Sequence, residues 1–172
     1  QMLLTSNKDG KAVLEEMIGL RKEEGDDDDM DWEEEILGKM ENGYENNRFS
    51  SFWEYDTDMT YPMILAKIPV KHPWEIFVYL PFGNWNECPD TPELMAVAKY
   101  WFEQHGAIPA VLTHDVLEFD LSAAISKECA MEVALEQYGF CPDVVDQGPE
   151  DATVGSLADG LRQSKVWYFW WD

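Results

Sequence analysis

The tripeptide Cys-Pro-Asp occurs twice, and each copy places a thiol two residues before a carboxylate. The copies are Cys88-Pro89-Asp90 and Cys141-Pro142-Asp143. Two thiolates, with His72, His114 or a carboxylate, would supply the four ligands that zinc prefers. However, no two cysteines lie two to four residues apart, which is the spacing of the familiar zinc pairs. We therefore expect no metal site, with each cysteine filling a small apolar gap and each aspartate bracing a loop.

Cys141 is a second chemical candidate, as a nucleophile activated by a histidine. Such catalysis needs the thiol within hydrogen-bond reach of a base, and the candidates are His72 and His114, with Asp143 or Asp146 as the orienting carboxylate. Cys141 follows a predicted helix, and the negative potential of a helix C-terminus raises a thiol pKa. This placement disfavours an activated thiol. The chain has no G-x-S-x-G elbow, phosphate loop, dinucleotide fingerprint or H-E-x-x-H motif.

Two acidic runs are candidates for a cation site. The first contains Asp143, Asp146, Gln147, Glu150 and Asp151. It suits a divalent cation or acid–base chemistry, but a solvated connection between helices has the same composition, and we favour the latter. The second run begins at Asp26 and fails the EF-hand pattern, because Trp32 and Gly38 replace the required Gly and Glu.

Trp85 is the tryptophan best placed to contact a ligand, because its Gly-Asn-Trp-Asn-Glu segment reads as a turn-rich loop. Most other tryptophans fit a core. A small enzyme or ligand-binding site is one hypothesis, provided that the loops Gly83–Asp90 and Phe140–Gly148 converge in space. Its candidate residues are Trp85, Asn86, Cys88, Asp90, Cys141, Asp143, Asp146 and Gln147.

Hydrophobic periodicity predicts the elements that would position these residues. In the first third we expect helices over Gly10–Glu24, with Gly25 as its stop, and over Asp31–Glu41. They would form a helical hairpin docked on the main domain or a partly mobile arm. Further on we expect a strand Ile64–Val70, a short helix Trp74–Leu80, and a helix from Leu94 to His105 that Gly106 ends. A hairpin over Ala107–Leu121, turning near His114-Asp115, should follow. The last two predicted elements are a helix capped by Ser126 and running to Tyr138 and a helix capped by Thr153.

The chain ends in a strand with aromatic residues on both faces. Trp167, Phe169 and Trp171 share one face, and Tyr168 and Trp170 share the other. A strand that is apolar on both faces is typically covered on both sides, so we expect it to lie inside the sheet, not at an edge. Together the elements predict an α+β fold: a mixed sheet with an aromatic C-terminal strand, packed by helices, plus an acidic N-terminal helical segment.

The charge excludes several function classes. The 172 residues contain 35 Asp+Glu and 12 Lys+Arg, a formal net charge of −23. Such a chain repels phosphate backbones and anionic membranes, so we expect neither direct nucleic-acid binding nor a membrane partner. Residues 1–60 carry a similar net charge to residues 61–172 over a much shorter length. We predict an acidic helical segment over 1–60 and an α+β domain over 61–172.

Three cysteines and no recognisable signal peptide predict reduced thiols, a cytoplasmic location and no cofactor.

Three motifs resemble a known family. They are Gly83–Pro89, Phe140–Asp143 with Asp146-Gln147-Gly148, and the terminal Trp167–Asp172. In this order they are similar to a bacterial family catalogued as domain of unknown function 4253, and the resemblance covers roughly residues 61–172. It implies a domain definition and a bacterial origin, but no activity and no catalytic residues.

The leading hypothesis is a non-enzymatic interaction protein that presents acidic surface to a basic protein. An immunity protein or antitoxin acting on a cationic toxin, or a nucleic-acid mimic, would use charge in this way. The carboxylates that we expect to contact the partner are Asp26, Asp27, Asp28, Asp29, Glu33 and Glu34.

Overall fold

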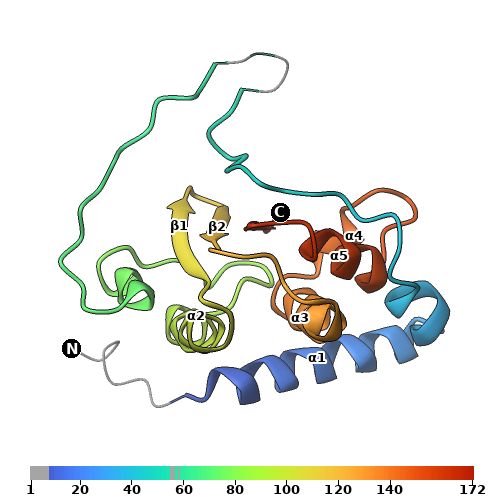
Figure 1. The fold of residues 1–172 in the computed structure, drawn as a ribbon. Helices are drawn as coiled ribbons and strands as arrows, with labels where there is room; N and C mark the ends of the chain where they lie inside the picture. Colours follow the sequence, from blue (N-terminus) through green and yellow to red (C-terminus); the bar gives the residue numbers. More distant parts are fainter. Residues whose placement is uncertain (1–7, 55–56, 58) are drawn as a thin grey trace.

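The structure is a computed structural model that describes residues 8–54, 57 and 59–172. It places a small sheet over two helices and a third helix below them (Figure 1). The strands are β1 (Ile108–Leu112), β2 (Val116–Asp120) and β3 (Val166–Trp170); the helices beneath are α2 (Thr91–His105) and α3 (Lys127–Phe140). Helix α1 (Gly10–Asp27) crosses both α2 and α3 on the side away from the sheet. The predicted α+β class is confirmed.

Local signals in the sequence set the ends of α2. The Asp90 carboxylate accepts a hydrogen bond from the Glu93 N–H at 2.8 Å, and the Glu93 carboxylate accepts one from the Asp90 N–H at 3.3 Å. This reciprocal cap satisfies two amides at the start of the helix. Gly106 ends the helix with φ 71°, a left-handed conformation that favours glycine. Asp90 is therefore a capping residue, as its sequence context indicates.

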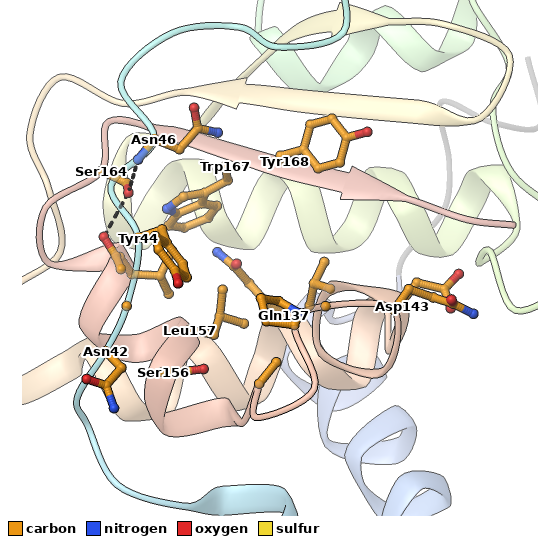
Figure 2. A pocket seen from close by; sticks show the side chains of 18 of the residues that line it. Asn42, Tyr44, Asn46, Gln137, Asp143, Ser156, Leu157, Ser164, Trp167 and Tyr168 are labelled. Atoms are coloured by element: carbon orange, nitrogen blue, oxygen red, sulfur yellow. Dashed lines mark hydrogen bonds between the residues drawn. The ribbon is translucent and has the colours of Figure 1, made fainter. Parts of the chain in front are cut away.

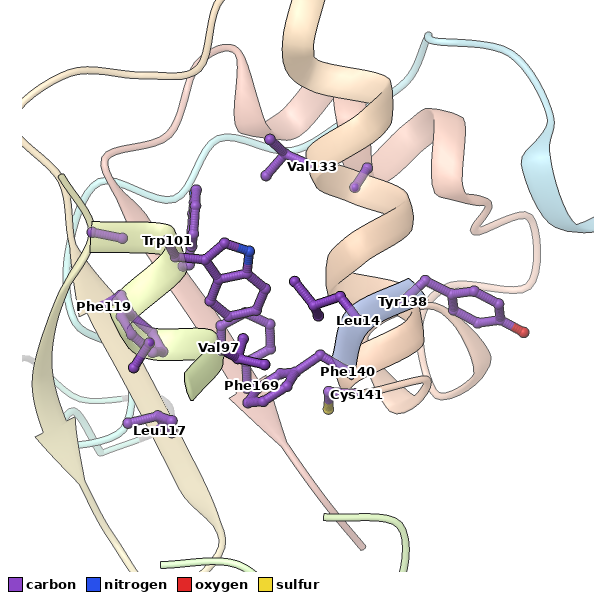
Figure 3. Close-up of a cluster of buried hydrophobic side chains, with 14 of the residues drawn as sticks. Leu14, Val97, Trp101, Leu117, Phe119, Val133, Tyr138, Phe140, Cys141 and Phe169 are labelled. Atoms are coloured by element: carbon purple, nitrogen blue, oxygen red, sulfur yellow. The ribbon is translucent and has the colours of Figure 1, made fainter. Parts of the chain in front are cut away.

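The core between α2, α3 and the sheet is aromatic (Figure 3). The Trp101 indole is fully buried, stacks on Phe169 at 5.4 Å between ring centroids and meets Phe140 edge-on at 5.0 Å. The buried Glu136 carboxylate of α3 accepts hydrogen bonds from Trp101 Nε1 and Tyr100 Oη, each at 2.9 Å. Aromatic pairs of this geometry contribute about 0.5–1.5 kcal/mol each beyond their burial.

The sheet is antiparallel in the order β1-β2-β3. As predicted, β1 and β2 form a hairpin that turns at His114-Asp115, where Thr113 N–H donates to the Val116 carbonyl. The Trp167, Phe169 and Trp171 side chains share the buried face, as alternation predicts. On the opposite face, the buried Glu118 carboxylate accepts hydrogen bonds from the N–H groups of Ser50 and Ser51, so the segment before residue 54 covers part of this face.

Two predictions about strands are wrong. β3 lies at an edge of the sheet, not inside it, because no described strand pairs with its far side. Loop residues, not a strand, cover part of this edge, where the Asn46 carbonyl accepts from Val166 N–H. Residues 64–70 form no strand; they run extended, and the Ile64 and Leu65 side chains are 94% and 100% exposed. These residues have strand-like character but no strand of the described chain lies beside them.

The first third differs in detail from its prediction. Helix α1 continues through Gly25 to Asp27, and the second predicted helix shortens to a π-helical turn, η2 (Trp32–Leu37), whose last amide, Gly38 N–H, bonds to the Glu33 carbonyl. Both elements are docked: α1 packs on α2 and α3, and η2 packs on α1 and on α5 (Val154–Leu161). The short helix predicted near Trp74 is present as η3, a 3-10 helix over Pro73–Val78.

The remaining predicted helices are present. The helix predicted to be capped by Ser126 is α3, but the Ser126 side chain makes no cap hydrogen bond, and the helix runs through Gly139, its predicted stop, to Phe140. The Thr153-capped helix is α5, where the Thr153 hydroxyl accepts from the Ser156 N–H at 3.1 Å. A further single turn, α4, spans Asp143–Asp146. None of the helices in the described part of the chain has the length and apolarity needed to cross a bilayer.

Candidate functional site

The loop Gly83–Asp90 is a closed turn whose geometry requires glycine at its start. Gly83 has φ 93°, and a Cβ there would lie 2.0 Å from the Pro89 carbonyl oxygen. The Asn84 N–H donates to that same oxygen at 3.0 Å and closes the loop. The Cys88 thiol is buried inside the turn, and burial raises its pKa to about 12. Cys88 is therefore a structural thiol that stays protonated at neutral pH.

The Cys141 thiol is also structural. It is fully buried and donates to the Trp170 carbonyl at 3.1 Å. Burial raises its pKa far above the usual range, and the neighbouring Asp143 carboxylate and Cys88 thiol add to this effect. The two candidate bases lie elsewhere: His114 is exposed and pairs with Asp115, and His72 is exposed and stacks on Trp74. The geometry does not support a cysteine–histidine nucleophile.

The two Cys-Pro-Asp loops do converge, but the space between them is filled. Phe82 and Phe140 both pack against the buried Trp171 ring, at 5.7 and 5.4 Å between centroids. Trp85 is half-buried and lies edge-on to Phe82 at 4.9 Å. A side-chain core, not a cleft, therefore joins the loops.

The eight residues of the candidate site divide accordingly. Asp90 caps α2, Asn86 holds a left-handed turn with φ 45°, and both cysteines are buried. The Asp143 carboxylate accepts from the Asp172 N–H at 3.1 Å and so ties α4 to the end of the chain. Asp146 and Gln147 are exposed. Of the set, only Asp143 and Gln147 line the cleft described next.

A cleft of about 350 Å³ lies along the outer side of β3 (Figure 2). Its walls come from β3, from α5, from the turn around α4 and from residues 42–46, which cross in front of α5. The crossing is close because glycines face each other: a Cβ on Gly43 would lie 2.1 Å from the Gly160 nitrogen. The cleft is within the volume range of natural ligand sites.

Two buried hydrogen-bond donors in this cleft have no partner. Gln137 Nε2 and Trp167 Nε1 are both inaccessible to solvent and unbonded among the described residues. The Gln137 amide points into the cleft, on the same side as the Trp167 ring (Figure 2). An unpaired buried donor costs about 1–3 kcal/mol, and an occupant of the cleft reaches these two nitrogens only when the side chains turn. Among the described residues, Asp143 and Asp151 line it, and no Lys, Arg or His does.

Sequence reasoning missed most of this cleft. Gln137 could have been found from the sequence, because an uncharged polar residue among the apolar positions of α3 indicates a buried polar site. The wall at residues 42–46 had no such signal, since its position depends on contacts with α5 and Ser164 more than 100 residues away in the chain.

Acidic residues are plentiful, but the described part of the chain contains no group of three or more His, Cys, Asp or Glu side chains arranged to hold a metal. The six acidic residues expected to contact a partner are all exposed, at the C-terminal end of α1 and on η2.

Comparison with known proteins gives a family. The model of the family described as Domain of unknown function (DUF4253) matches residues 64–172, more than half of the chain. The chain belongs to this family. The DUF4253 match includes both Cys-Pro-Asp loops, α5 and β3, whereas α1, η2 and the cleft wall at residues 42–46 precede it. Neither the curated proteins nor the solved structures contain a match to the chain.

Proposed function

We propose that the protein is a non-enzymatic binding protein that presents a fixed carboxylate surface to a basic protein partner. Inhibition of a cationic toxin, as by an immunity protein or antitoxin, or mimicry of a nucleic acid, would use this surface. We call it the acidic corner, and it consists of Asp26, Asp27, Asp28, Asp29, Glu33 and Glu34. A bacterial origin and a cytoplasmic location belong to the same proposal.

The observation that carries the proposal is the position of three of these carboxylates at the C-terminus of α1. Asp26 and Asp27 end the helix, Asp28 is its C-cap, and no basic residue lies in its last turn. The C-terminus of a helix carries partial negative charge, so each carboxylate in its last turn reduces stability by about 0.3–1 kcal/mol. Charge that opposes folding in this way is expected where it serves binding.

The acidic corner is held in place by packing. Met30 N–H bonds to the Gly25 carbonyl at 3.0 Å, and the Trp32 ring lies 3.6 Å from the position that a Cβ on Gly25 would occupy. Lys22 Nζ lies 5.4 Å from the centroid of that ring. None of the six corner carboxylates forms a salt bridge with another described residue. Fixed, unpaired charges lower the ordering cost of binding and steer a cationic partner.

The catalytic alternative lacks support. A site between the loops Gly83–Asp90 and Phe140–Gly148 would need the Phe82, Phe140 and Trp171 rings to separate. Both thiols that it would use are protonated and buried at neutral pH.

A pull-down from a bacterial extract tests the proposal with two charge-matched variants. The corner variant replaces Asp26, Asp27, Asp28 and Asp29 with Asn. The control replaces the exposed Glu15, Glu16, Asp120 and Glu150 with Gln or Asn, which removes the same number of charges elsewhere. We expect a basic protein to be retained by the wild type and by the control at 25 mM NaCl, and to be lost from the corner variant.

Two further readouts accompany the pull-down. Retention should fall as NaCl rises to 150 mM, because screening weakens contacts between exposed charges. The corner variant should also unfold at a higher temperature than the control, since the charges that oppose the helix dipole are gone. Absence of any basic protein at 25 mM NaCl, or equal loss from both variants, would overturn the proposal.

A further inference from the structure

An extended apolar segment, residues 61–70, lies uncovered on the surface. Tyr61, Met63, Ile64 and Leu65 are 48%, 55%, 94% and 100% exposed, and none of residues 61–70 belongs to a helix or strand. Contiguous exposed apolar surface of this kind marks an interaction site. The segment also lies in an acid-free stretch: residues 59–74 contain no Asp or Glu, and they include Lys67 and Lys71.

The outer edge of β3 offers matching hydrogen-bond groups. Leu121 N–H bonds to the Lys165 carbonyl, and Trp171 N–H bonds to the Asp115 carbonyl. In an antiparallel pair every second residue is hydrogen-bonded to the neighbouring strand, so these two bonds show which residues of β3 face β2. Odd-numbered residues of β3 therefore bond to β2, and the N–H and C=O of Tyr168 point away from it. Among the described residues no backbone group bonds to them, while Asn46 and Cys141 occupy the two ends of this edge through Val166 N–H and the Trp170 carbonyl.

The two edges of the sheet are protected differently. β1 contains Pro109 and a register shift between Pro109 and Val111, and η3 packs against it. Proline, bulges and covering elements are the usual means of preventing strand addition. β3 has no proline, lysine or bulge along Val166–Trp170, although α4 packs against it as η3 packs against β1. Strand addition is therefore directed to β3.

We propose that the segment around Leu65 of a second copy of this chain adds to the edge of β3 where that edge is open, at Tyr168. Its backbone pairs with Tyr168, and an apolar side chain enters the cleft beside α5. Lys67 and Lys71 approach the rim formed by Asp143 and Asp151, so the charges are complementary.

A second copy is favoured over the chain's own segment by the topology. Residues 61–70 connect at one end to the Phe52 carbonyl, through Tyr61 N–H, and at the other end to η3, which packs on β1. The segment thus leaves the body on the β1 side, and the free edge of β3 is on the opposite side of the sheet (Figure 1). Reciprocal exchange between two copies closes a symmetric dimer.

Sedimentation velocity and light scattering over 1–200 μM protein test the proposal with the full chain. The edge variant is Tyr168→Pro, which removes the outward N–H and leaves the β2 ladder intact; Tyr168→Thr is its control. The segment variant is Leu65→Asp, and its control is Leu20→Asp, at a half-exposed leucine on α1. We expect a dimer for the wild type and both controls, and a dissociation constant at least tenfold higher for each of the two variants.

Mixing the two variants gives a sharper test. The Tyr168→Pro chain still has an intact segment and the Leu65→Asp chain an intact edge, so an equimolar mixture should associate more strongly than either alone. The Tyr168 amide should exchange hydrogen slowly in the dimer and rapidly in Leu65→Asp. If Tyr168→Pro does not fold, as judged by circular dichroism, Leu65→Asp and the exchange rate decide the matter. A monomeric wild type at 200 μM, or a dimer unaffected by Leu65→Asp, would overturn the proposal.

The test of the dimer can be distinguished from the test of partner binding at the acidic corner by its dependence on salt. Association of two chains of net charge −23 should strengthen with salt as their repulsion is screened, whereas binding of a basic protein at the acidic corner should weaken.

Discussion

At the scale of single residues, the most chemically suggestive groups serve the structure. Asp90 caps a helix, and Cys88 and Cys141 fill buried gaps in two loops. These roles could be predicted from sequence because they depend on near neighbours: Thr91-Pro92-Glu93 follows Asp90, and a proline follows each of the two cysteines. The unpaired Gln137 could not, because its surroundings come from β3 and α5.

The thiols should therefore differ sharply in reactivity. Cys129 is exposed, whereas Cys88 and Cys141 are buried with raised pKa values. Because the thiolate is the reactive form, we expect one thiol per chain to react rapidly with Ellman's reagent at pH 8, and three after unfolding in guanidinium chloride. The Cys129→Ser variant should show almost no rapid reaction. A second fast thiol in this variant would contradict the assignment of both loop cysteines as structural.

Glu136 should make folding depend on pH. Burial raises its carboxyl pKa above the ordinary 4.5, although the Trp101 and Tyr100 hydrogen bonds oppose this shift. The folded state then binds the proton more tightly than the unfolded state, so the group's favourable contribution is full below the ordinary pKa and is lost as pH rises through the folded pKa.

Urea unfolding from about pH 4 to pH 7 measures this effect. The free energy of unfolding of the wild type, relative to Glu136→Gln, should fall as pH rises across this range and then level off. The exposed Glu150→Gln, at a residue that does not contribute to the Glu136 pKa, serves as the control and should show a much smaller change. A wild-type to Glu136→Gln difference that does not vary with pH would show that burial leaves the carboxyl unperturbed.

At the scale of elements, prediction succeeded where the signal was local. Helices α2 and α5 and the β1–β2 hairpin each carry a cap, a glycine stop or a tight turn in their own sequence. It failed for residues 64–70 and for the edge position of β3, because strand pairing depends on a partner that is distant in sequence. From the apolar residues of a strand alone, one cannot predict whether a sheet, a helix or a loop covers them.

The docking of α1 gives a prediction at this scale. A Cβ on Gly10 would lie 2.2 Å from the Ala96 carbonyl oxygen, so Gly10→Ala must push α1 away from α2. We expect it to reduce the free energy of unfolding by about 1–3 kcal/mol. Gly19, in the same helix, has nothing within 4 Å of its Cβ position. Gly19→Ala should therefore raise it by about 0.5–1 kcal/mol, as the helix preference for alanine dictates. Equal effects of the two changes in urea unfolding would mean that α1 is not closely packed at its start.

At the scale of the whole molecule, the charge is unevenly distributed: one surface is rich in carboxylates and another stretch has none. The acidic corner lies on α1 and η2, before the residues matched by the family model. Residues 59–74, without a carboxylate, lie mostly within that match. In a chain of net charge −23, the first of these surfaces is the one that we propose for a basic protein, and the second contains the segment that we propose for the cleft of another copy.

This imbalance should make the folded state sensitive to ionic strength. The compact chain concentrates its carboxylates, and their mutual repulsion opposes folding. Raising NaCl from 10 to 100 mM shortens the screening length from about 30 to about 10 Å. We expect a stabilisation of ~1 kcal/mol, which corresponds to a rise of about 2–4 °C in Tm for a chain of this length. The measurement is made on Leu65→Asp at 1 μM, so that self-association does not contribute. Adding the four Asp→Asn changes of the acidic corner should reduce the rise, because they remove repulsion in the folded state. A Tm that falls with salt would instead mean that the few salt bridges, such as that of Arg21 with Glu24 and Glu87, outweigh the net repulsion.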